Sequence, residues 1–313
     1  MNFEYQKLYE NLIINKCKVT IIDYSPNSKA YKYYPFSHYP SVTALDELTN
    51  LIIDNVVFYA FTEDEIVSLN KNIGLLEDLR MAAKYAFSER LPKRKNPNSD
   101  GTVGEVLLDL LLQAFEPTSQ KLVARAKHTE LGKRTTEITG YDALYFTQEN
   151  NKLYLWLGQA KAGTETYCKS SILDDLNTKF GEDYFSNTLF YIADKCDSNE
   201  LADLLTEINR ICFQAQKNKW DSDTKLKQLL DFLKSRDVKI KIPCLLAYSK
   251  DIYSSGKLTE NIIKVSNEII NSFDNQSFSI NFDLPYEIRF YIFPIKDISY
   301  IRSKIVEFKK EVV

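Results

Sequence analysis

The chain of 313 residues has only two histidines, His38 and His128. A zinc centre built on histidines, or a Ser-His-Asp hydrolase, therefore has few possible constructions. The five cysteines are an odd number, and their spacings fit neither a zinc site nor a disulfide framework. We therefore expect their thiols to be reduced, as they are in cytoplasmic proteins.

Long apolar runs are also missing. No run approaches the ~18 residues needed to span a bilayer. The start, MNFEYQKLYE, lacks the basic stretch and apolar run of a signal peptide. We therefore expect a cytoplasmic protein that makes no membrane contact. Glycine and proline number nine each, whereas tyrosine and phenylalanine number 20 and 18, which is typical of a folded chain. The absence of a glycine-rich phosphate loop or nucleophile motif counts against a small-molecule enzyme.

A surplus of basic residues is absent as well, since 40 Lys and Arg face 43 Asp and Glu, for a net charge of −3. Nucleic-acid binding usually uses such a surplus, so contact with DNA would need a local basic patch or a basic partner. Two clusters are candidates: Arg90, Lys93, Arg94 and Lys95, and then Lys121, Arg125, Lys127, His128, Lys133 and Arg134. Within the second, we assign DNA contacts to Arg125, Lys127, Lys133 and Arg134. The alternative is solvated linker and strand-edge charge.

The predicted fold is α/β, in three parts. Residues 1–89 form an N-terminal α/β region, with a strand at 17–24 and helices at 41–56 and 63–89, the second broken near Gly74. The polar stretch 90–101, with two prolines and one glycine, is a linker or exposed loop. Residues 102–313 form the main domain, divided into a core at 102–195 and a C-terminal α/β extension at 196–313.

The core has the predicted order α-β-β-β-α-β. Its elements are a helix at 102–115, strands at 121–128, 139–147 and 152–161, a helix at 165–180 and a strand at 187–195. The extension is predicted to contain helices at 198–217, 222–236, 258–273 and 297–312 and strands at 240–248 and 287–294.

The two central strands of the core, 139–147 and 152–161, have the pattern of a hairpin. If Asn150 and Asn151 form a two-residue turn, Glu149 pairs with Lys152. Counting back along both strands then puts residue 142 opposite residue 159. Cross-strand partners point to the same face of a sheet, and so does the residue two further along a strand.

This register gathers Asp142, Gln159 and Lys161 at one end of an otherwise apolar face. Burying an unpaired charge there is costly, and a divalent cation such as Mg²⁺ or Mn²⁺ would relieve the cost. Asp142 would be the main ligand, Gln159 would add its carbonyl oxygen, and Lys161 would orient water or steady the charge developing on a phosphate. The alternative is an Asp-Lys ion pair at a strand end, beside a satisfied glutamine.

Glu105 lies in the first turn of the preceding helix. With Thr102 it has the spacing of a capping box, and acidic charge there also suits the helix dipole. The functional interpretation makes Glu105 an added metal-site carboxylate, and the two interpretations can coexist. Asp109, one turn later on the same side, is a further candidate, and Gln113 follows it.

The motifs on these elements resemble those of the PD-(D/E)XK nuclease superfamily. They are Glu105, Gly140-Tyr141-Asp142 and Gln159-Ala160-Lys161. This resemblance implies a nuclease-like core, with a mixed sheet flanked by helices. The segments GEVLLDLLL, TGYDALYF, LYLWLGQAK and RFYIFPIKD resemble, more closely, the HamA family, the nuclease-like subunit of the Hachiman anti-phage system. The likeness is strongest over about residues 100–195.

The resemblance implies an Mg²⁺-dependent deoxyribonuclease that acts with a helicase partner, HamB. Its catalytic residues would be Glu105, Asp142, Gln159 and Lys161, of which the first three would hold the metal. The superfamily pattern at the second ligand is usually E-x-K, whereas this chain has Gln159; some restriction-type nucleases use Q-x-K. The alternative, favoured by Gln159 and the missing basic surplus, is a catalytically inactive nuclease-fold subunit that binds DNA or regulates the helicase.

Overall fold

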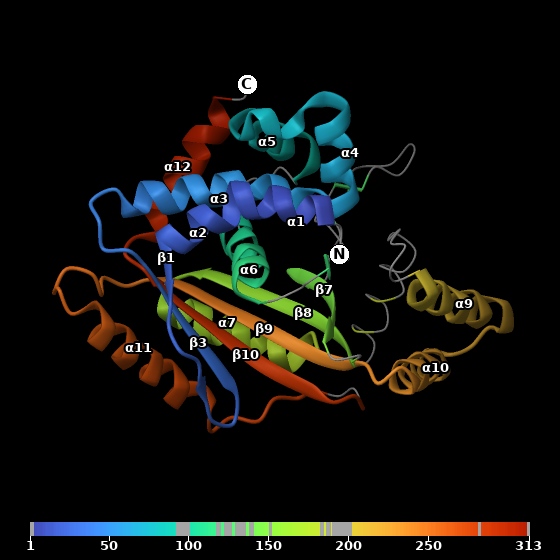
Figure 1. Cartoon of the computed structure of the whole chain (residues 1–313). Helices are drawn as coiled ribbons and strands as arrows, with labels where there is room; N and C mark the ends of the chain where they lie inside the picture. Colours follow the sequence, from blue (N-terminus) through green and yellow to red (C-terminus); the bar gives the residue numbers. More distant parts are fainter. Residues whose placement is uncertain are drawn as a thin grey trace.

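The computed structural model of this chain describes residues 3–91, 101–116, 120–121, 127–128, 136–137, 141–149, 152–181, 185, 189, 202–280 and 283–311. These residues form a mixed sheet with helices on both faces (Figure 1). The fold is therefore a layered, mixed α/β architecture, as the sequence predicts.

The large sheet has the strand order β1-β3-β10-β9-β8-β7-β4, with β2 paired to β3. Strands β3, β10, β9 and β8 run parallel to one another, whereas β7 is antiparallel to β8. The bounds are β1 (Ile21–Asp23), β2 (Asn27–Ser28), β3 (Lys32–His38), β4 (Gln120–Lys121), β7 (Ala143–Glu149), β8 (Lys152–Gly163), β9 (Lys239–Ser249) and β10 (Tyr286–Ile295). A separate two-stranded sheet joins β5 (Lys127–His128) to β6 (Thr136–Glu137).

Parallel neighbours need crossover connections, which helices supply. On one face lie α1 (Phe3–Tyr9), η1 (Glu10–Ile14), α2 (Asn15–Thr20), α3 (Ala44–Ala60), α4 (Glu63–Ile73), η2 (Leu75–Glu77), α5 (Leu79–Tyr85), η3 (Ala86–Arg90), α6 (Thr102–Phe115) and α12 (Ile298–Lys310). Against the other face pack α7 (Glu165–Thr178) and α11 (Leu258–Phe273), and apolar residues of α9 (Ala202–Asn218) and α10 (Ser222–Ser235) belong to the same core cluster. Helices α9 and α10 project from the body beside the start of β9 (Figure 1).

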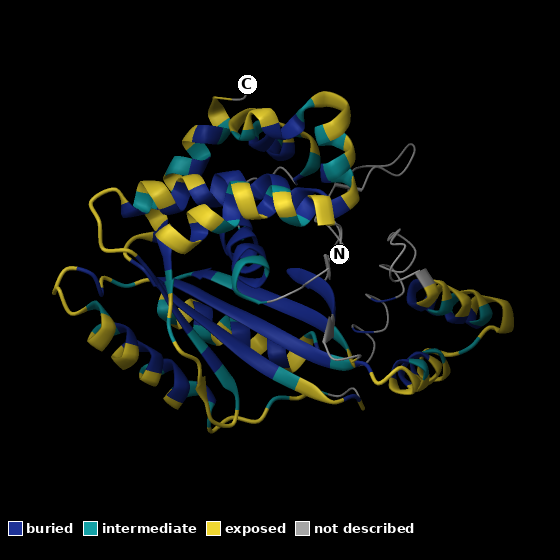
Figure 2. Ribbon diagram, in the orientation of Figure 1, coloured by how far each residue is buried: buried dark blue, intermediate teal, exposed yellow. Residues whose placement is uncertain are grey.

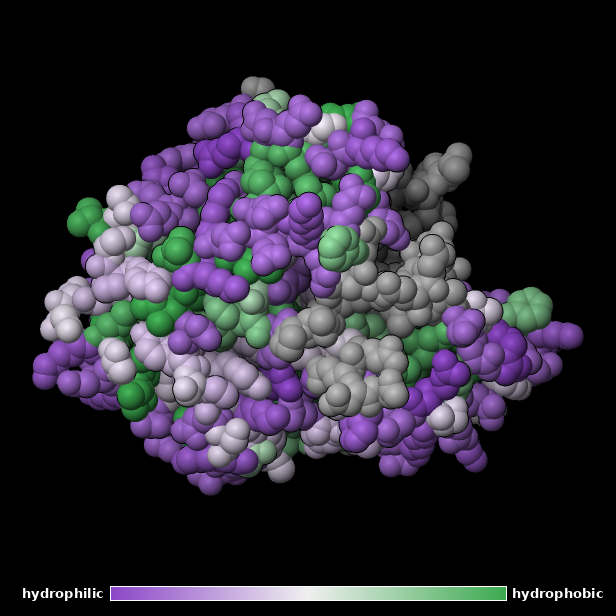
Figure 3. Space-filling model, viewed as in Figure 1, coloured by the Kyte–Doolittle hydropathy of each residue, from purple (hydrophilic) through white to green (hydrophobic). Residues whose placement is uncertain are grey.

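Alternation along β8 separates the two hydrophobic cores. Trp156 and Ala160 belong to the core beneath α3 and α6, whereas Leu155 and Leu157 belong to the core beneath α7. The central strands are dark, buried bands in Figure 2, so apolar residues on both faces of β8 are covered. On the face seen in Figure 3, hydrophilic residues predominate over the N-terminal helices and over α9 and α10.

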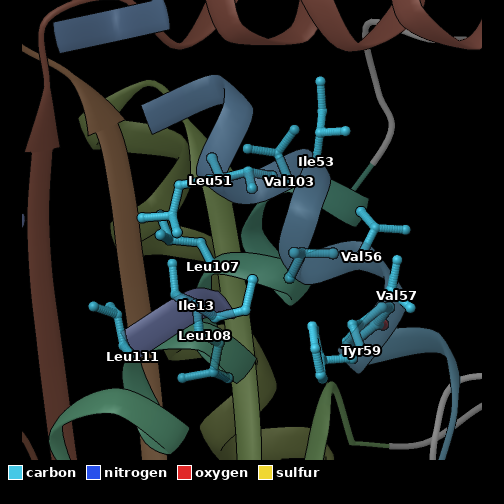
Figure 4. Close-up of a cluster of buried hydrophobic side chains, with 14 of the residues drawn as sticks. Ile13, Leu51, Ile53, Val56, Val57, Tyr59, Val103, Leu107, Leu108 and Leu111 are labelled. Carbon is cyan, nitrogen blue, oxygen red and sulfur yellow. The ribbon is translucent and has the colours of Figure 1, made fainter. Parts of the chain in front are cut away.

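Helix α6 is the most deeply buried helix near the proposed chemistry. Val103 and Leu107 lie beside Leu51 of α3, and Leu111 belongs to the same buried cluster (Figure 4). Removing one such buried side chain down to alanine costs about 2–5 kcal/mol. The start of α6 is therefore held firmly against the sheet.

Most predicted elements are confirmed, several of them to within a few residues. Helix 102–115 is α6, the hairpin strands are β7 and β8, and helix 165–180 is α7. The helix predicted at 63–89 does break at Gly74, which ends α4 with a left-handed backbone at φ 65°. The helices and strands of the extension are also present.

Three strand predictions need correction. The strand predicted at 17–24 is helical up to Thr20, and only Ile21–Asp23 is extended. Leu189, inside the strand predicted at 187–195, is helical, and most of that range lies outside the described residues. Among the described residues, the next strand of the sheet after α7 is β9, which runs parallel to β8. Of the strand predicted at 121–128, only the two ends are described, in different sheets.

The N-terminal region adds to the sheet of the main domain. Strand β3, which we did not predict, pairs in parallel with β10, and β1 pairs with β3. The four described cysteines, Cys17, Cys168, Cys212 and Cys244, are free thiols. In the described part of the chain, no helix is both long and apolar enough to cross a membrane.

Candidate active site

The β7–β8 hairpin has the register predicted from its turn. Ala143 pairs with Gly158, and Glu149 pairs with Lys152. Asp142 precedes the first paired residue, and its backbone N–H still donates to the Gly158 carbonyl at 2.8 Å. Asp142 therefore stands opposite Gln159, as predicted, at the end of the hairpin where β8 continues alone.

A cavity of about 500 Å³ opens at this end of the sheet. It lies at the carboxyl ends of β8 and β9, next to the first turns of α6, α7 and α12. We call it the strand-end cavity. Its charged lining residues are Glu105, Asp142, Lys161 and Arg302, and its hydroxyl-bearing ones are Thr164, Tyr167, Ser249 and Ser299. The carboxyl ends of parallel strands are where open α/β sheets commonly bind ligands.

Glu105 reaches the cavity because α6 approaches β8 closely. At Gly104, an added Cβ would lie 3.3 Å from the Cβ of Ala162, which is tight enough to disfavour a larger residue. The Glu105 side chain is buried, and its Oε2 accepts a hydrogen bond of 2.7 Å from the Tyr59 hydroxyl. The predicted capping box does not form, since α6 begins at Thr102 itself and the cap position is Gly101. The two carboxylates Glu105 and Asp142 thus line one cavity.

Gln159 and Lys161 point toward α7, on the face that they were predicted to share. The Lys161 ammonium forms an ion pair of 2.6 Å with Asp175, and Asp175 also pairs with Lys179 at 3.1 Å. Lys179 in turn donates to the Gln159 amide oxygen at 2.9 Å. Gln159 is fully buried and is not among the residues described as lining the cavity. The oxygen predicted to bind metal therefore accepts a hydrogen bond from the Lys179 ammonium here.

The charge state of Lys161 follows from this pairing. Burial by itself lowers the pKa of the Lys161 ammonium, but the hydrogen bond and charge of Asp175 raise it above its ordinary value, and the charge of Asp142 adds to the rise. Lys161 is consequently held as a cation at the edge of the cavity. It is the form that can stabilise negative charge on a phosphate.

Asp109 lies elsewhere, one turn further along α6. It is buried, accepts from Asn55 at 3.1 Å and from Gln113 at 2.8 Å, and is hydrogen-bonded to the Tyr145 hydroxyl. These contacts join α3, α6 and β7. The further candidate from the sequence is thus part of the structural core and does not reach the cavity.

The predicted DNA-contacting residues cannot be placed. Arg125, Lys133 and Arg134 lie outside the described residues, and only the backbone of Lys127 is described, in β5. From the other basic cluster, Arg90 pairs with Glu65 and stacks over Phe61, whereas Lys93, Arg94 and Lys95 lie outside the described residues. Gly140 of the G-x-D motif lies outside them too.

The donor set of the cavity suits a hard divalent cation. Mg²⁺ and Mn²⁺ prefer carboxylate, carbonyl and water oxygens, and Glu105 and Asp142 offer two carboxylates. No group of three or more His, Cys, Asp or Glu side chains has metal-site geometry in the described part of the chain. Water and a substrate phosphate would therefore have to complete the coordination, as is usual for Mg²⁺.

Sequence reasoning missed Asp175, Lys179 and Arg302. Asp175 of α7 and Lys179, which caps the C-terminus of that helix, are four residues apart and so lie on one side of it. Only the packing of α7 on β8 shows that this side meets Lys161. Arg302 comes from α12, far from the hairpin in sequence, and no local pattern indicates its position.

The molecule is thus a mixed α/β protein with a charged cavity at the carboxyl end of its parallel strands. A family model for HamA matches residues 11–309, and the chain therefore belongs to the HamA family. The family predicted from the motifs is confirmed, and it connects the chain with Hachiman anti-phage defence. No curated protein matches the chain.

Proposed function

We propose that the chain is a metal-dependent deoxyribonuclease effector that acts with a helicase in anti-phage defence. The observation that supports this proposal is the strand-end cavity, in which the carboxylates of Glu105 and Asp142 lie with the cations Lys161 and Arg302. Hydrolysis of a phosphodiester needs charge neutralisation on the phosphate and an oriented water. We take DNA as the substrate and a helicase as the partner because the family resemblance implies them.

Each residue of the proposed site has a distinct task. Glu105 and Asp142 would hold Mg²⁺ or Mn²⁺, which, when bound, neutralises charge on the phosphate and activates water. Lys161, already held as an ammonium by Asp175, would steady charge that develops on the phosphate. For Gln159 to serve as a third ligand, its amide oxygen must exchange Lys179 for the metal.

Plasmid cleavage with Mg²⁺ or Mn²⁺, with and without the helicase, tests the proposal. We expect metal-dependent cutting that a chelator abolishes and that Lys161→Ala reduces by about 10²-fold or more, while Mn²⁺ binding by that variant stays nearly intact. Lys304, on α12, gives a matched control as Lys304→Ala, because its contacts among the described residues are with Glu307 and Tyr300 of the same helix. Parent protein that never cuts, alone or with the helicase, would rule the nuclease out.

A second candidate is a non-catalytic subunit that binds DNA or regulates the helicase. It is favoured by the pairing of Lys161 with Asp175 and of Gln159 with Lys179, since the Lys161 ammonium and the Gln159 amide oxygen both have protein partners without metal. Phage protection separates the candidates. Asp142→Ala and Lys161→Ala should both lose protection beside the intact partner gene if the chain is a nuclease. Full protection by both variants would leave the non-catalytic subunit.

A further inference from the structure

Arg302 lines the strand-end cavity from the second turn of α12, one turn after Ile298 and Ser299, which line it too. Its Nη2 donates to the carbonyl of Ala162, near the end of β8, at 2.8 Å. This bond ties the guanidinium to the same strand that carries Lys161. The guanidinium is therefore held in place by a hydrogen bond to the sheet.

The Arg302 guanidinium has a donor that no acceptor of the described residues pairs with. Its Nε is buried and has no hydrogen-bond partner, and within the described residues no carboxylate forms an ion pair with it. The other cation of the cavity, Lys161, is different because Asp175 neutralises it. Buried polar groups normally find partners, and an unmatched one calls for an explanation. A ligand anion would supply the missing acceptor.

We infer that Arg302 binds a phosphate of the nucleic-acid backbone, holding it toward Glu105 and Asp142. An arginine fork suits the two oxygens of a phosphate better than a lysine does, because it offers parallel donors in a fixed plane. With Nη2 anchored on Ala162, the fork has donors left over for such an oxygen. The inference rests on the proposed function for the identity of the phosphate as that of a phosphodiester.

A purely structural arginine would behave differently. If Arg302 served only to tie α12 to β8 through Ala162, its loss would lower the melting temperature and leave binding of phosphate unchanged. If it binds phosphate, affinity falls even in a variant that folds normally. Binding and stability measured on the same variants therefore separate the two roles.

The test is the binding of a short fluorescent single-stranded DNA to the full chain, with Ca²⁺ in place of Mg²⁺ to prevent cutting. We expect Arg302→Gln to weaken binding by about 10-fold or more, the usual loss for a charge-assisted hydrogen bond. Arg302→Lys should be intermediate. Lys304→Gln removes the same charge from the same helix, at an exposed residue paired with Glu307, and should bind like the parent.

The outcomes distinguish this inference from the proposed function. Equal binding by Arg302→Gln and Lys304→Gln, or no measurable binding by the parent, would overturn the role of Arg302, whatever the plasmid assay shows. Arg302-dependent binding without any plasmid cleavage would keep Arg302 as a phosphate-binding residue of a non-catalytic subunit and reject the nuclease. Melting temperatures of all the variants identify any loss that comes from unfolding.

Discussion

The carboxylate of Asp142 accepts a hydrogen bond from the backbone N–H of Ala160, with 2.8 Å between Oδ2 and the nitrogen. The bond continues the β7–β8 ladder one step beyond its last paired residues, Ala143 and Gly158. A side chain that completes a backbone ladder has a single well-defined position. Asp142 is therefore fixed at the cavity by the fold itself.

Asp142 both completes the β7–β8 ladder and lines the cavity, so two different substitutions of it should give different results. Asp142→Asn keeps an oxygen that can accept from Ala160, so the melting temperature should stay near that of the parent, while the lost charge weakens Mn²⁺ binding and cuts cleavage by about 10²-fold or more. Asp142→Ala should also lose about 1–3 kcal/mol of stability. Calorimetry and plasmid cleavage measure both effects. Full cleavage by Asp142→Asn would show that its charge is not used.

The ion pair between Lys161 and Asp175 predicts a change in pH dependence. Asp175→Asn removes the hydrogen bond and the charge that raise the pKa of Lys161 most, so this pKa falls. If Lys161 acts as an ammonium, cleavage should then fail at a lower pH than in the parent, because the lysine loses its proton earlier as pH rises. Asp174→Asn, an exposed neighbour on α7, is the matched control. Superimposable pH profiles for the two variants would contradict this role.

Gln159 stands where the superfamily usually has the glutamate of E-x-K, and its contact with Lys179 affects what restoring that glutamate would do. Gln159→Glu should keep or raise affinity for Mn²⁺, since a carboxylate binds hard cations better than an amide does. Because Lys179 already bonds the Gln159 oxygen at 2.9 Å, the gain should be larger in a Lys179→Met background. Isothermal titration with Mn²⁺ measures both. Weaker binding after Gln159→Glu would argue against a metal site here.

The Asp109 network predicts a stability effect without an effect on catalysis. Tyr145→Phe removes the hydroxyl that is hydrogen-bonded to the buried Asp109 carboxylate, which should cost about 1–3 kcal/mol. The variant should cut DNA like the parent at temperatures where both are folded. Tyr39→Phe, at a partly exposed tyrosine, should change stability little. A loss of cleavage without a loss of stability would mean that Asp109 does contribute to the chemistry.

Local patterns were enough to predict the hairpin and most helices. A two-residue connection predicts the register that β7 and β8 have, and hydrophobic periodicity predicts α6 and α7. The same reasoning failed at residues 17–20, where β-branched and apolar residues suggested a strand. Those residues instead continue the N-terminal helical run, and Cys17 is buried in the core with α3.

The features that the sequence did not predict depend on packing between segments that are distant along the chain. Strand β3 contains Pro35, which lacks a donor and normally argues against a strand interior, yet it pairs with β10. The contact of Lys161 with Asp175 requires α7 to present one particular face to β8. The contact of Arg302 with Ala162 requires α12 to pack near the end of the same strand. No spacing within one segment carries that information.

Strand β10 lies between β9 and β3, so β3 can join the sheet only after residues 286–295 have been synthesised. The cavity likewise takes Glu105 from the middle of the chain and Arg302 from its final helix. During synthesis, a ribosome-bound chain lacks α12 until residues 298–310 have been translated. A chain cut short by a premature stop has an open sheet and an incomplete cavity, so interrupted translation yields a product without the full set of charged groups.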